Sequence, residues 1–335
     1  MNEFAFAYGM PQSRGKIKVC PEDFYVEEEL GFELTGEGEH LFLQIEKKSL
    51  TTEEMVKEIA RKLDINFKLI SYAGLKDKFA QARQWFSIHL PGQSDPCLNH
   101  LASEQYQVLQ TMRHNKKLKI GSLKGNHFRI KISDFHCNQS DIEYRIDNII
   151  KSGVPNYYGL QRFGNHFSNL NNAQALLFEN KKIKNRYLRG LYYSAARSFL
   201  FNQILNQRVL QNCWNKPVKG DLMMLAGTNS VFKPDEINEE IMQRVLIHDI
   251  YPAAPLWGEG ENRVTDDALF MESSALNPWE KWCEKLELHQ LKKTYRATVL
   301  LPKQFSFEKD TFSFSLPKGA FATSVLREIL MLESS

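Results

Sequence analysis

Apolar and polar residues alternate along four stretches of the chain, which predicts half-buried β-strands because successive side chains of a strand point to opposite faces. The clearest case is 127–133, where Phe128, Ile130 and Ile132 share one face and basic or hydroxyl residues share the other. The remaining three stretches are 40–46, 85–90 and 311–316. An apolar segment, 69–73, and the segment 295–301 are further strand candidates.

Helical signals lie between these strands. Thr51 and Glu54 have the spacing of a capping box, in which each side chain bonds a free backbone N–H group at the start of a helix, and apolar residues recur at helical spacing up to Leu63. We expect further helices over 140–152 and 321–331, and a mostly helical region from 167 to about 218. The region 219–277 is rich in Gly and Pro and reads as irregular.

A break in this pattern divides the chain. Gly153 and Pro155 interrupt the helix that ends at Ser152, and the chain of 335 residues is longer than one core usually serves. We predict an α+β domain formed by 1–154 and 302–335, into which a more helical domain, 155–301, is inserted. Such an insertion is physically easy because the ends of a domain often lie close together.

The amino-acid composition argues against several classes of protein. With 42% hydrophobic and 25% charged residues the chain resembles an ordinary globular protein. Its first residues show no basic and apolar leader, and no segment has the roughly 20 apolar residues that span a bilayer, so we expect no signal peptide and no membrane. The five cysteines form no CxxC pair, and His136 beside Cys137 is isolated, which favours reduced thiols in a cytoplasmic protein over disulfides or zinc.

Net charge is only +3, but basic residues are concentrated. The segments 113–124 and 181–189 each contain five Lys or Arg and no acid. Such a strip can hold a phosphate backbone, and it is also typical of an ordinary solvated face.

A possible catalytic carboxylate follows the strand 69–73. Gly74 leads into Lys76, Asp77 and Lys78, and nearby positive charge favours the ionised form of an acid. Neighbouring residues of an extended segment point opposite ways, so both lysines cannot address Asp77, and one of them could meet a phosphate. A surface turn with alternating charges would show the same pattern.

The wider motif set resembles one family. The segment 73–78 reads AGLKDK and is followed by Gln84 and Trp85, which is similar to the signature of the TruD family of pseudouridine synthases. Six further segments agree with this family in the expected order, over essentially the whole chain. They are PEDFYV at 21–26, GEGEH at 36–40, KGNHF at 124–128, PNYYGLQRFG at 155–164 and SAARS at 194–198, and GAFATS at 319–324 completes the set.

The resemblance implies a function. It implies a catalytic domain with a mixed, largely antiparallel sheet like that of pseudouridine synthases, and an inserted domain specific to the TruD family. It implies a uridine of tRNA as the substrate, usually uridine 13, with Asp77 at the catalytic position. Phe24, Asn126 and Phe321 match the family's contacts with the substrate nucleotide, and Lys18 and Phe128 lie in matching segments. We further expect basic side chains to hold the RNA backbone: Lys76, Lys78, Lys116, Lys117, Lys119, Lys124, Arg162, Lys181, Lys182 and Lys184.

The chemistry of the reaction is compatible with these residues. Pseudouridylation breaks the bond between uracil N1 and the sugar and rejoins the base through C5, so no cofactor and no metal are expected. The base must leave its stack and be held by aromatic faces, worth about 1–3 kcal/mol per base. Asp77 could act as a nucleophile on C1′ of the sugar or C6 of the base, or as a base that removes the 2′ proton.

Two other functions remain open at this point. A non-catalytic RNA-binding or RNA-chaperone protein could keep the same fold, and an RNA methyltransferase would need a cofactor pocket that the sequence does not offer. We expect a monomer, and the sequence implies no protein partner.

Overall fold

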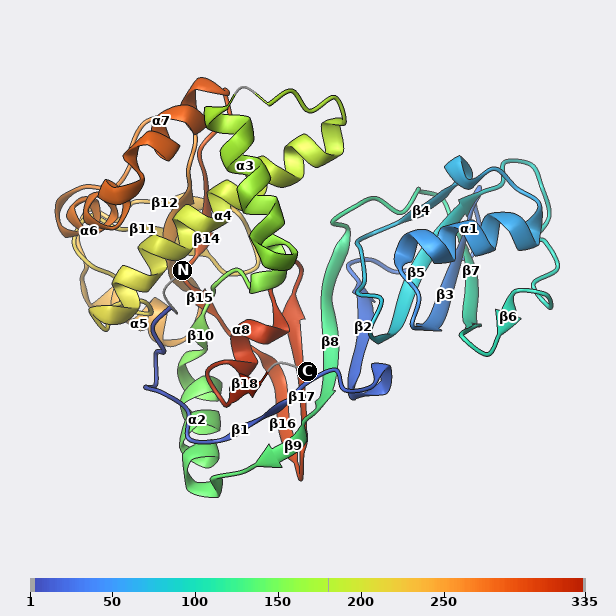
Figure 1. Ribbon diagram of the computed structural model, residues 1–335, viewed down its shortest axis with the longest axis horizontal. Helices are drawn as coiled ribbons and strands as arrows, with labels where there is room; N and C mark the ends of the chain where they lie inside the picture. Colours follow the sequence, from blue (N-terminus) through green and yellow to red (C-terminus); the bar gives the residue numbers. More distant parts are fainter. Residues whose placement is uncertain (1–3, 180, 334–335) are drawn as a thin grey trace. The chain divides into compact units, whose positions relative to one another are not determined.

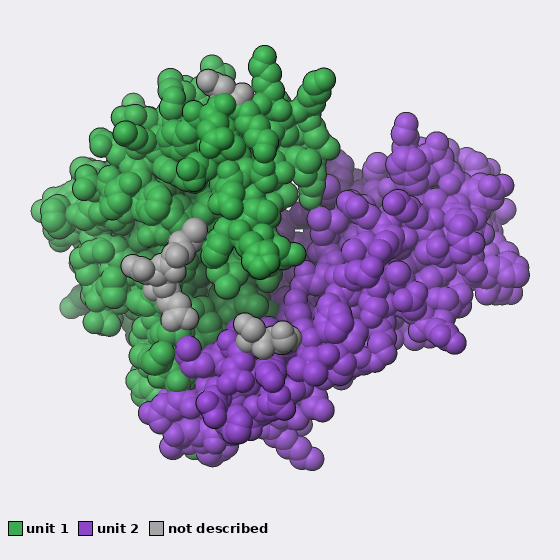
Figure 2. Space-filling model, in the orientation of Figure 1, with its two compact units in different colours: residues 1–11, 143–301, 320–329 green, residues 12–142, 302–319, 330–335 purple. Residues whose placement is uncertain are grey.

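The computed structural model describes residues 4–179 and 181–333, and the chain forms two compact units (Figure 2). Unit 1 contains the described parts of residues 1–11, 143–301 and 320–329. Unit 2 contains those of 12–142, 302–319 and 330–335. The boundaries of these units differ from those of the predicted domains, because an N-terminal segment and the segment that begins at Ala320 belong to unit 1. The assignment of a catalytic and an inserted domain concerns function and stays a prediction.

Within the described residues, unit 2 is built on a nine-stranded sheet (Figure 1). Its strands follow the order β16-β17-β8-β2-β5-β3-β7-β6, and β4 pairs with β5 in addition. Strands β2 and β5 run parallel and the other neighbours are antiparallel, which confirms the predicted mixed, largely antiparallel sheet. The strands are β2 (Phe24–Leu30), β3 (His40–Lys48), β4 (Ile70–Tyr72), β5 (Gln81–His89), β6 (Ala102–Ser103), β7 (Tyr106–His114), β8 (Leu123–Lys131), β16 (Lys303–Glu308) and β17 (Thr311–Pro317).

Helix α1 (Thr52–Leu63) packs on this sheet. Its capping box forms as predicted: the Thr51 hydroxyl accepts from the Glu54 N–H at 3.0 Å, and the Glu54 carboxylate accepts from the Thr51 N–H at 2.7 Å. Met55 and Ile59 are fully buried in one apolar cluster with residues of β3 and β5. The capping box therefore fixes the N-terminus of this helix beside the strand ends that carry the candidate site.

A second, small sheet of unit 2 has the order β18-β1-β9. It contains β1 (Arg14–Lys16), β9 (Ser133–His136) and β18 (Met331–Glu333). The prediction of a helix over 321–331 is wrong in its extent, because α8 (Ala322–Leu326) ends after five residues. The Met331 N–H instead donates to the Ser13 carbonyl at 2.9 Å, so that strand pairing replaces the helix at the end of this segment.

Unit 1 contains most of the helices and two further sheets. The long helix α4 forms the centre of its core, with Phe199, Leu200 and Ile204 fully or almost fully buried. The four-stranded sheet has the order β12-β11-β13-β14, and β10 pairs with β15. Most of α2 (Gln139–Ser152) belongs to unit 1, although its first residues lie in unit 2. The other elements are α3 (Ser168–Phe178), α4 (Arg186–Leu210), α5 (Glu239–Leu246), α6 (Asp266–Leu276), α7 (Glu280–Leu288), β10 (Val154–Pro155), β11 (Leu222–Leu225), β12 (Val231–Phe232), β13 (Ile250–Leu256), β14 (Thr294–Ala297) and β15 (Val299–Leu300). Short 3₁₀ helices cover Pro21–Asp23, Phe67–Leu69, Leu160–Phe163, Asn165–Phe167 and Asn277–Trp279.

The prediction that 219–277 is irregular is wrong. This region supplies three strands of the four-stranded sheet and the helices α5 and α6. Strand β13 contains Pro252 and Pro255 although it pairs on both sides, and proline is normally confined to sheet edges. These prolines explain why the sequence pattern does not predict this central strand.

Candidate active site

The loop that carries Asp77 joins β4 to β5 and is fixed by a chain of hydrogen bonds. The buried Gln84 side chain donates to the Gly74 carbonyl at 2.8 Å. Gln84 also accepts from the Thr52 hydroxyl at 3.1 Å, and that hydroxyl accepts from the Lys76 N–H at 2.9 Å. The start of α1 and the glutamine of the QW motif thus hold the loop backbone on both sides of Leu75, two residues before Asp77.

The Asp77 carboxylate is half exposed, and one cation contacts it. The Lys18 ammonium lies 2.5 Å from Asp77 Oδ2, and the side-chain exposures are 24% and 49%. The same ammonium lies 4.4 Å from the ring centroid of Phe24. Lys18 has a left-handed backbone with φ of 60°, which is uncommon outside glycine and is often found at functional sites. The structure therefore brings Lys18, Phe24 and Asp77 together, as expected of residues that share one pocket.

Lys76 and Lys78 pair with carboxylates other than Asp77. The Lys76 ammonium lies 2.8 Å from Glu28 Oε1 and donates to Asn126 Oδ1 at 2.7 Å. The Lys78 ammonium lies 3.0 Å from Glu54 Oε1. Both lysines are thus paired with carboxylates of unit 2, which weighs against their predicted role as contacts of the RNA backbone.

Glu28 is the buried counterion of the site, and it was missed by the sequence interpretation. Its side chain is fully buried, and Oε2 accepts from the Trp85 N–H at 2.8 Å. Burial raises the pKa of Glu28, and the ammonium of Lys76 acts in the opposite direction. No local signal marks it, since only the pairing of β2 with β8 places Glu28 directly opposite Asn126.

Asn126 is held in one orientation by Lys76. A lysine ammonium can only donate hydrogen bonds, so the oxygen of the Asn126 amide must face it. The amide nitrogen of Asn126 is then the group available to a ligand. Asn126 therefore offers a hydrogen-bond donor that suits a carbonyl oxygen of uracil.

Lys47 is a second buried charge that the sequence interpretation did not single out. Its side chain is fully buried, and the ammonium donates to the Leu50 carbonyl at 2.5 Å. Burial, followed by the charge of Lys76, lowers the pKa of Lys47 to about 8, while Glu28 and Asp77 act in the opposite direction. The alternation of β3 contained this signal, because Lys47 shares the face of the buried Leu41, Leu43 and Ile45.

Phe24 and Phe128 are both buried, with exposures of 6% and 8%. Their rings meet edge to face at 6.1 Å, and Phe128 also lies 5.8 Å from Phe314. Phe128 therefore packs as a core residue, whereas Phe24 also contacts the lysine that pairs with Asp77. Contact of either ring with a base stays a prediction.

Phe321 belongs to unit 1, where it precedes α8. Its ring meets that of Tyr158 edge to face at 5.7 Å. Gly159 permits this packing, because a Cβ atom there would lie 2.6 Å from Thr323 Oγ1 and 3.5 Å from the Phe321 ring. The family segments 155–164 and 319–324 are thus neighbours within one compact unit.

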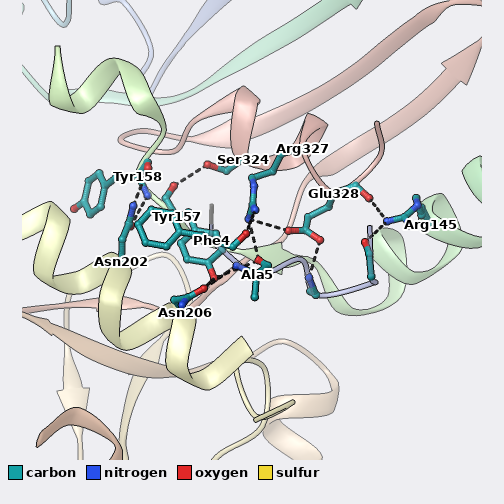
Figure 3. Close-up of polar contacts among 12 residues, drawn as sticks. Phe4, Ala5, Arg145, Tyr157, Tyr158, Asn202, Asn206, Ser324, Arg327 and Glu328 are labelled. Carbon is teal, nitrogen blue, oxygen red and sulfur yellow. Dashed lines mark hydrogen bonds and ion pairs between the residues drawn. The ribbon is translucent and has the colours of Figure 1, made fainter. Parts of the chain in front are cut away.

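Polar contacts fix the segment that follows Phe321 (Figure 3). The Ser324 hydroxyl donates to the Tyr157 carbonyl at 2.7 Å, and the backbone of Tyr158 exchanges two hydrogen bonds with the Asn202 amide. The Phe4 ring stacks on Tyr157 at 5.1 Å, and the Arg327 guanidinium donates to the Phe4 carbonyl. The N-terminal segment therefore supports the turn that presents Phe321.

The predicted contacts of the RNA backbone fall into different environments. Lys116, Lys117, Lys119, Lys182 and Lys184 are exposed, as is Lys181, which donates to the Asn172 side chain at 2.9 Å. Lys124 is exposed and pairs with Glu29 at 2.5 Å. Arg162 differs from all of these, since it is half buried beside Tyr158.

The described residues contain no group of three or more His, Cys, Asp or Glu side chains that could hold a metal ion. Over the same residues, no helix combines the length and apolar character needed to cross a membrane.

Comparisons with known proteins agree with this arrangement. The family model of tRNA pseudouridine synthase D (TruD) matches residues 1–182 and 181–329. A protein named tRNA pseudouridine synthase D from Legionella pneumophila (strain Lens) is 44% identical over 329 residues, covering 97% of both chains. A protein of the same name from Aeromonas hydrophila is 41% identical over 340 residues, covering 100% of this chain and 96% of its own.

A solved structure shares the fold. The crystal structure of a TruD protein from Methanosarcina mazei superposes with a TM-score of 0.73 at 21% sequence identity, covering 98% of this chain and 96% of the other. The fold is thus that of a pseudouridine synthase with mixed α and β structure. The chain belongs to the tRNA pseudouridine synthase D (TruD) family.

Proposed function

We propose that this protein isomerises a uridine of tRNA to pseudouridine and that Asp77 is its catalytic carboxylate. The observation that carries the proposal is the half-exposed Asp77 carboxylate, which lies against Lys18 beside the Phe24 ring in the family's KD motif. Uridine 13 is the position we propose, in keeping with the resemblance to the family. A tRNA-modifying enzyme would act in the cytoplasm.

The proposed reaction needs no net gain or loss of atoms. The N1–C1′ bond breaks, a C5–C1′ bond forms, the proton of C5 is lost, and N1 gains a proton. Asp77 would act as a nucleophile or as the base for the 2′ proton. The Asn126 amide nitrogen would donate to a uracil carbonyl, and the rings of Phe24 and Phe321 would contact the everted nucleotide.

The exposed lysines at 116, 117, 119, 181, 182 and 184 are the proposed contacts of the tRNA backbone. They support a long-range attraction that depends on salt and not on sequence.

The decisive experiment replaces Asp77 by Asn. We expect the D77N variant to bind tRNA with unchanged affinity and to form no pseudouridine, because the amide is neither a nucleophile nor a base. Product is measured by chemical mapping of pseudouridine and by release of hydrogen from C5. Asp134→Asn is a matched control, since Asp134 is also an exposed aspartate of unit 2 that pairs with a lysine, Lys16, at 2.8 Å.

The alternatives give other outcomes. Full pseudouridine formation by the Asp77→Asn variant would remove Asp77 from the catalytic role. An RNA-chaperone protein would bind tRNA without forming product even before substitution. A methyltransferase would add mass to the RNA, whereas isomerisation leaves the mass unchanged.

A further inference from the structure

Two arginines of unit 1 share one aromatic ring. The guanidinium carbon of Arg296 lies 4.2 Å from the centroid of the Tyr158 ring, and that of Arg162 lies 5.5 Å from it. Both side chains are half buried. Arg162 comes from the 3₁₀ helix that follows Tyr158, whereas Arg296 comes from β14, so the fold brings two distant parts of the chain to this ring.

The hydrogen bonds of these arginines hold them in place. Arg162 donates to the Ser198 and Ser194 hydroxyls from α4. Arg296 donates to the Asn156 carbonyl and to the Asn156 side-chain oxygen, the latter at 2.5 Å. The serine hydroxyls are neutral acceptors, so they orient the Arg162 guanidinium without cancelling its charge.

The placement of two cations at one ring is costly. Burial lowers the pKa of Arg162, and it also lowers the pKa of Arg296, on which the charge of Arg162 acts in the same direction. Among the described residues no carboxylate forms an ion pair with Arg162. An anion bound beside the ring would relieve this repulsion.

A third arginine adds to the positive potential. Arg197 lies on α4, and burial lowers the pKa of its guanidinium as well. Its guanidinium donates to the carbonyls of Leu256 and Lys292, both at 2.8 Å, so Arg197 has a structural task in closing these loops. We therefore do not count it as part of the site.

The neighbouring Phe321 indicates which anion the site fits. The Phe321 ring packs on the Tyr158 ring, and its proposed role is to contact the target nucleotide. A nucleotide contacting Phe321 would bring its own phosphodiester groups close to the same cluster. The planar fork of a guanidinium matches phosphate oxygens better than a lysine does.

We propose that Arg162 and Arg296, mounted on the Tyr158 ring, bind a phosphodiester group directly adjacent to the target uridine. This inference rests on the proposed function, because it takes the nucleotide at Phe321 to be the target. The site would position the everted nucleotide by its backbone, independently of the exposed lysine strips.

The test is a binding cycle in the inactive Asp77→Asn background. In the protein, Arg162→Gln or Arg296→Gln removes one guanidinium group. In the tRNA, a neutral methylphosphonate replaces the phosphate either 5′ or 3′ of the mapped target uridine. We expect one of the two methylphosphonates to weaken binding by about tenfold in the background protein, the size of a lost charge-assisted contact. The same methylphosphonate should weaken binding by less than about twofold once either arginine is absent, because the contact is then already lost.

Arg263→Gln is the matched control, since Arg263 is an exposed arginine of unit 1 that lies 5.8 Å from the Tyr295 ring. This variant should keep the full tenfold response to the methylphosphonate. Thermal unfolding checks each protein, and if Arg296→Gln does not fold, the cycle with Arg162→Gln decides.

The inference is overturned if neither methylphosphonate weakens binding, or if the loss persists undiminished in the arginine variants. A uniform loss of affinity with no coupling to either phosphate also overturns it. Pseudouridine formation by the unaltered enzyme on unaltered tRNA is measured in parallel. If product forms and the coupling is absent, only this inference fails, whereas absence of product refutes the proposed function.

Discussion

The buried ion pair beneath the Asp77 loop allows a quantitative prediction. Glu28 and Lys76 are joined at 2.8 Å, with side-chain exposures of 0% and 9%. Removing one partner of such a pair costs about 3–5 kcal/mol of the free energy of unfolding, because the other charge stays buried. For Glu28→Gln we expect the low end, about 3 kcal/mol, since an amide oxygen can still accept from the Trp85 N–H.

The Lys76→Met variant should depend on pH. Burial raises the pKa of Glu28, and without Lys76 the opposing influence of this ammonium is gone. A carboxyl whose folded pKa lies above its unfolded pKa can be protonated in the folded protein at little cost below the unfolded value. The destabilisation should therefore be small at acid pH and grow as pH rises through the folded pKa of Glu28.

Urea unfolding of both single variants and the double variant measures the coupling. Independent substitutions would add to within about 0.5 kcal/mol. We expect the double variant Glu28→Gln with Lys76→Met to be more stable than this sum by about 2 kcal/mol or more, because neither charge is left alone. Additive losses would refute the view that the two groups form one buried unit.

The same variants report on the active site. Lys76 orients the Asn126 amide, so Lys76→Met should lower kcat/KM for tRNA more than it lowers tRNA affinity. An unchanged kcat/KM in folded Lys76→Met protein would show that the orientation of Asn126 does not matter.

Two further predictions concern unit 1. Burial raises the pKa of Glu272 to about 8 from an ordinary 4.5, so stability should be full below pH 4.5 and fall as pH rises through 8. Glu272→Gln should remove this loss, which amounts to about 5 kcal/mol above pH 8, and pH-dependent urea unfolding with no difference between the two proteins would contradict it. Gly159→Ala should destabilise by about 1–3 kcal/mol and reduce activity, because its Cβ would lie 2.6 Å from Thr323 Oγ1 and crowd Phe321. Gly190→Ala in α4 is its control, since no atom beyond the neighbouring residues and the backbone of its own helix lies within 4 Å of that Cβ, and equal losses in thermal unfolding would refute the steric argument.

Local signals predicted most of the elements correctly. The capping box at Thr51 and the alternation in β3, β8 and β17 depend on near neighbours, which the sequence displays directly. Strand β13 depends instead on pairing with β11 and β14 on both sides, which compensates for its prolines. The apolar residues up to Met331 suit a helix. This segment forms a strand instead because Met331 bonds to Ser13, which is distant along the chain.

The candidate site was less accessible to sequence reasoning. Local chemistry alone could not distinguish Asp77 from a charged surface turn, and the family resemblance made the difference. The partners of Asp77 and Lys76 are 59 and 50 residues away along the chain, at Lys18 and Asn126. No local pattern indicates which lysine faces which acid, because strand pairing between β2, β8 and β5 determines it.

The charges around this loop explain why Asp77 is the carboxylate that remains available. Glu28 is fully buried and held by Lys76 and the Trp85 N–H. Glu54 is occupied by its cap, and the hydrogen bond from the Thr51 backbone together with that from Lys78 lowers the pKa of Glu54 to about 2. Asp77 has the Lys18 ammonium on one oxygen and is otherwise half exposed. A substrate that displaces the Lys18 ammonium would therefore reach Asp77, whereas Glu28 is buried and the Glu54 carboxylate is already bonded to the Thr51 N–H and the Lys78 ammonium.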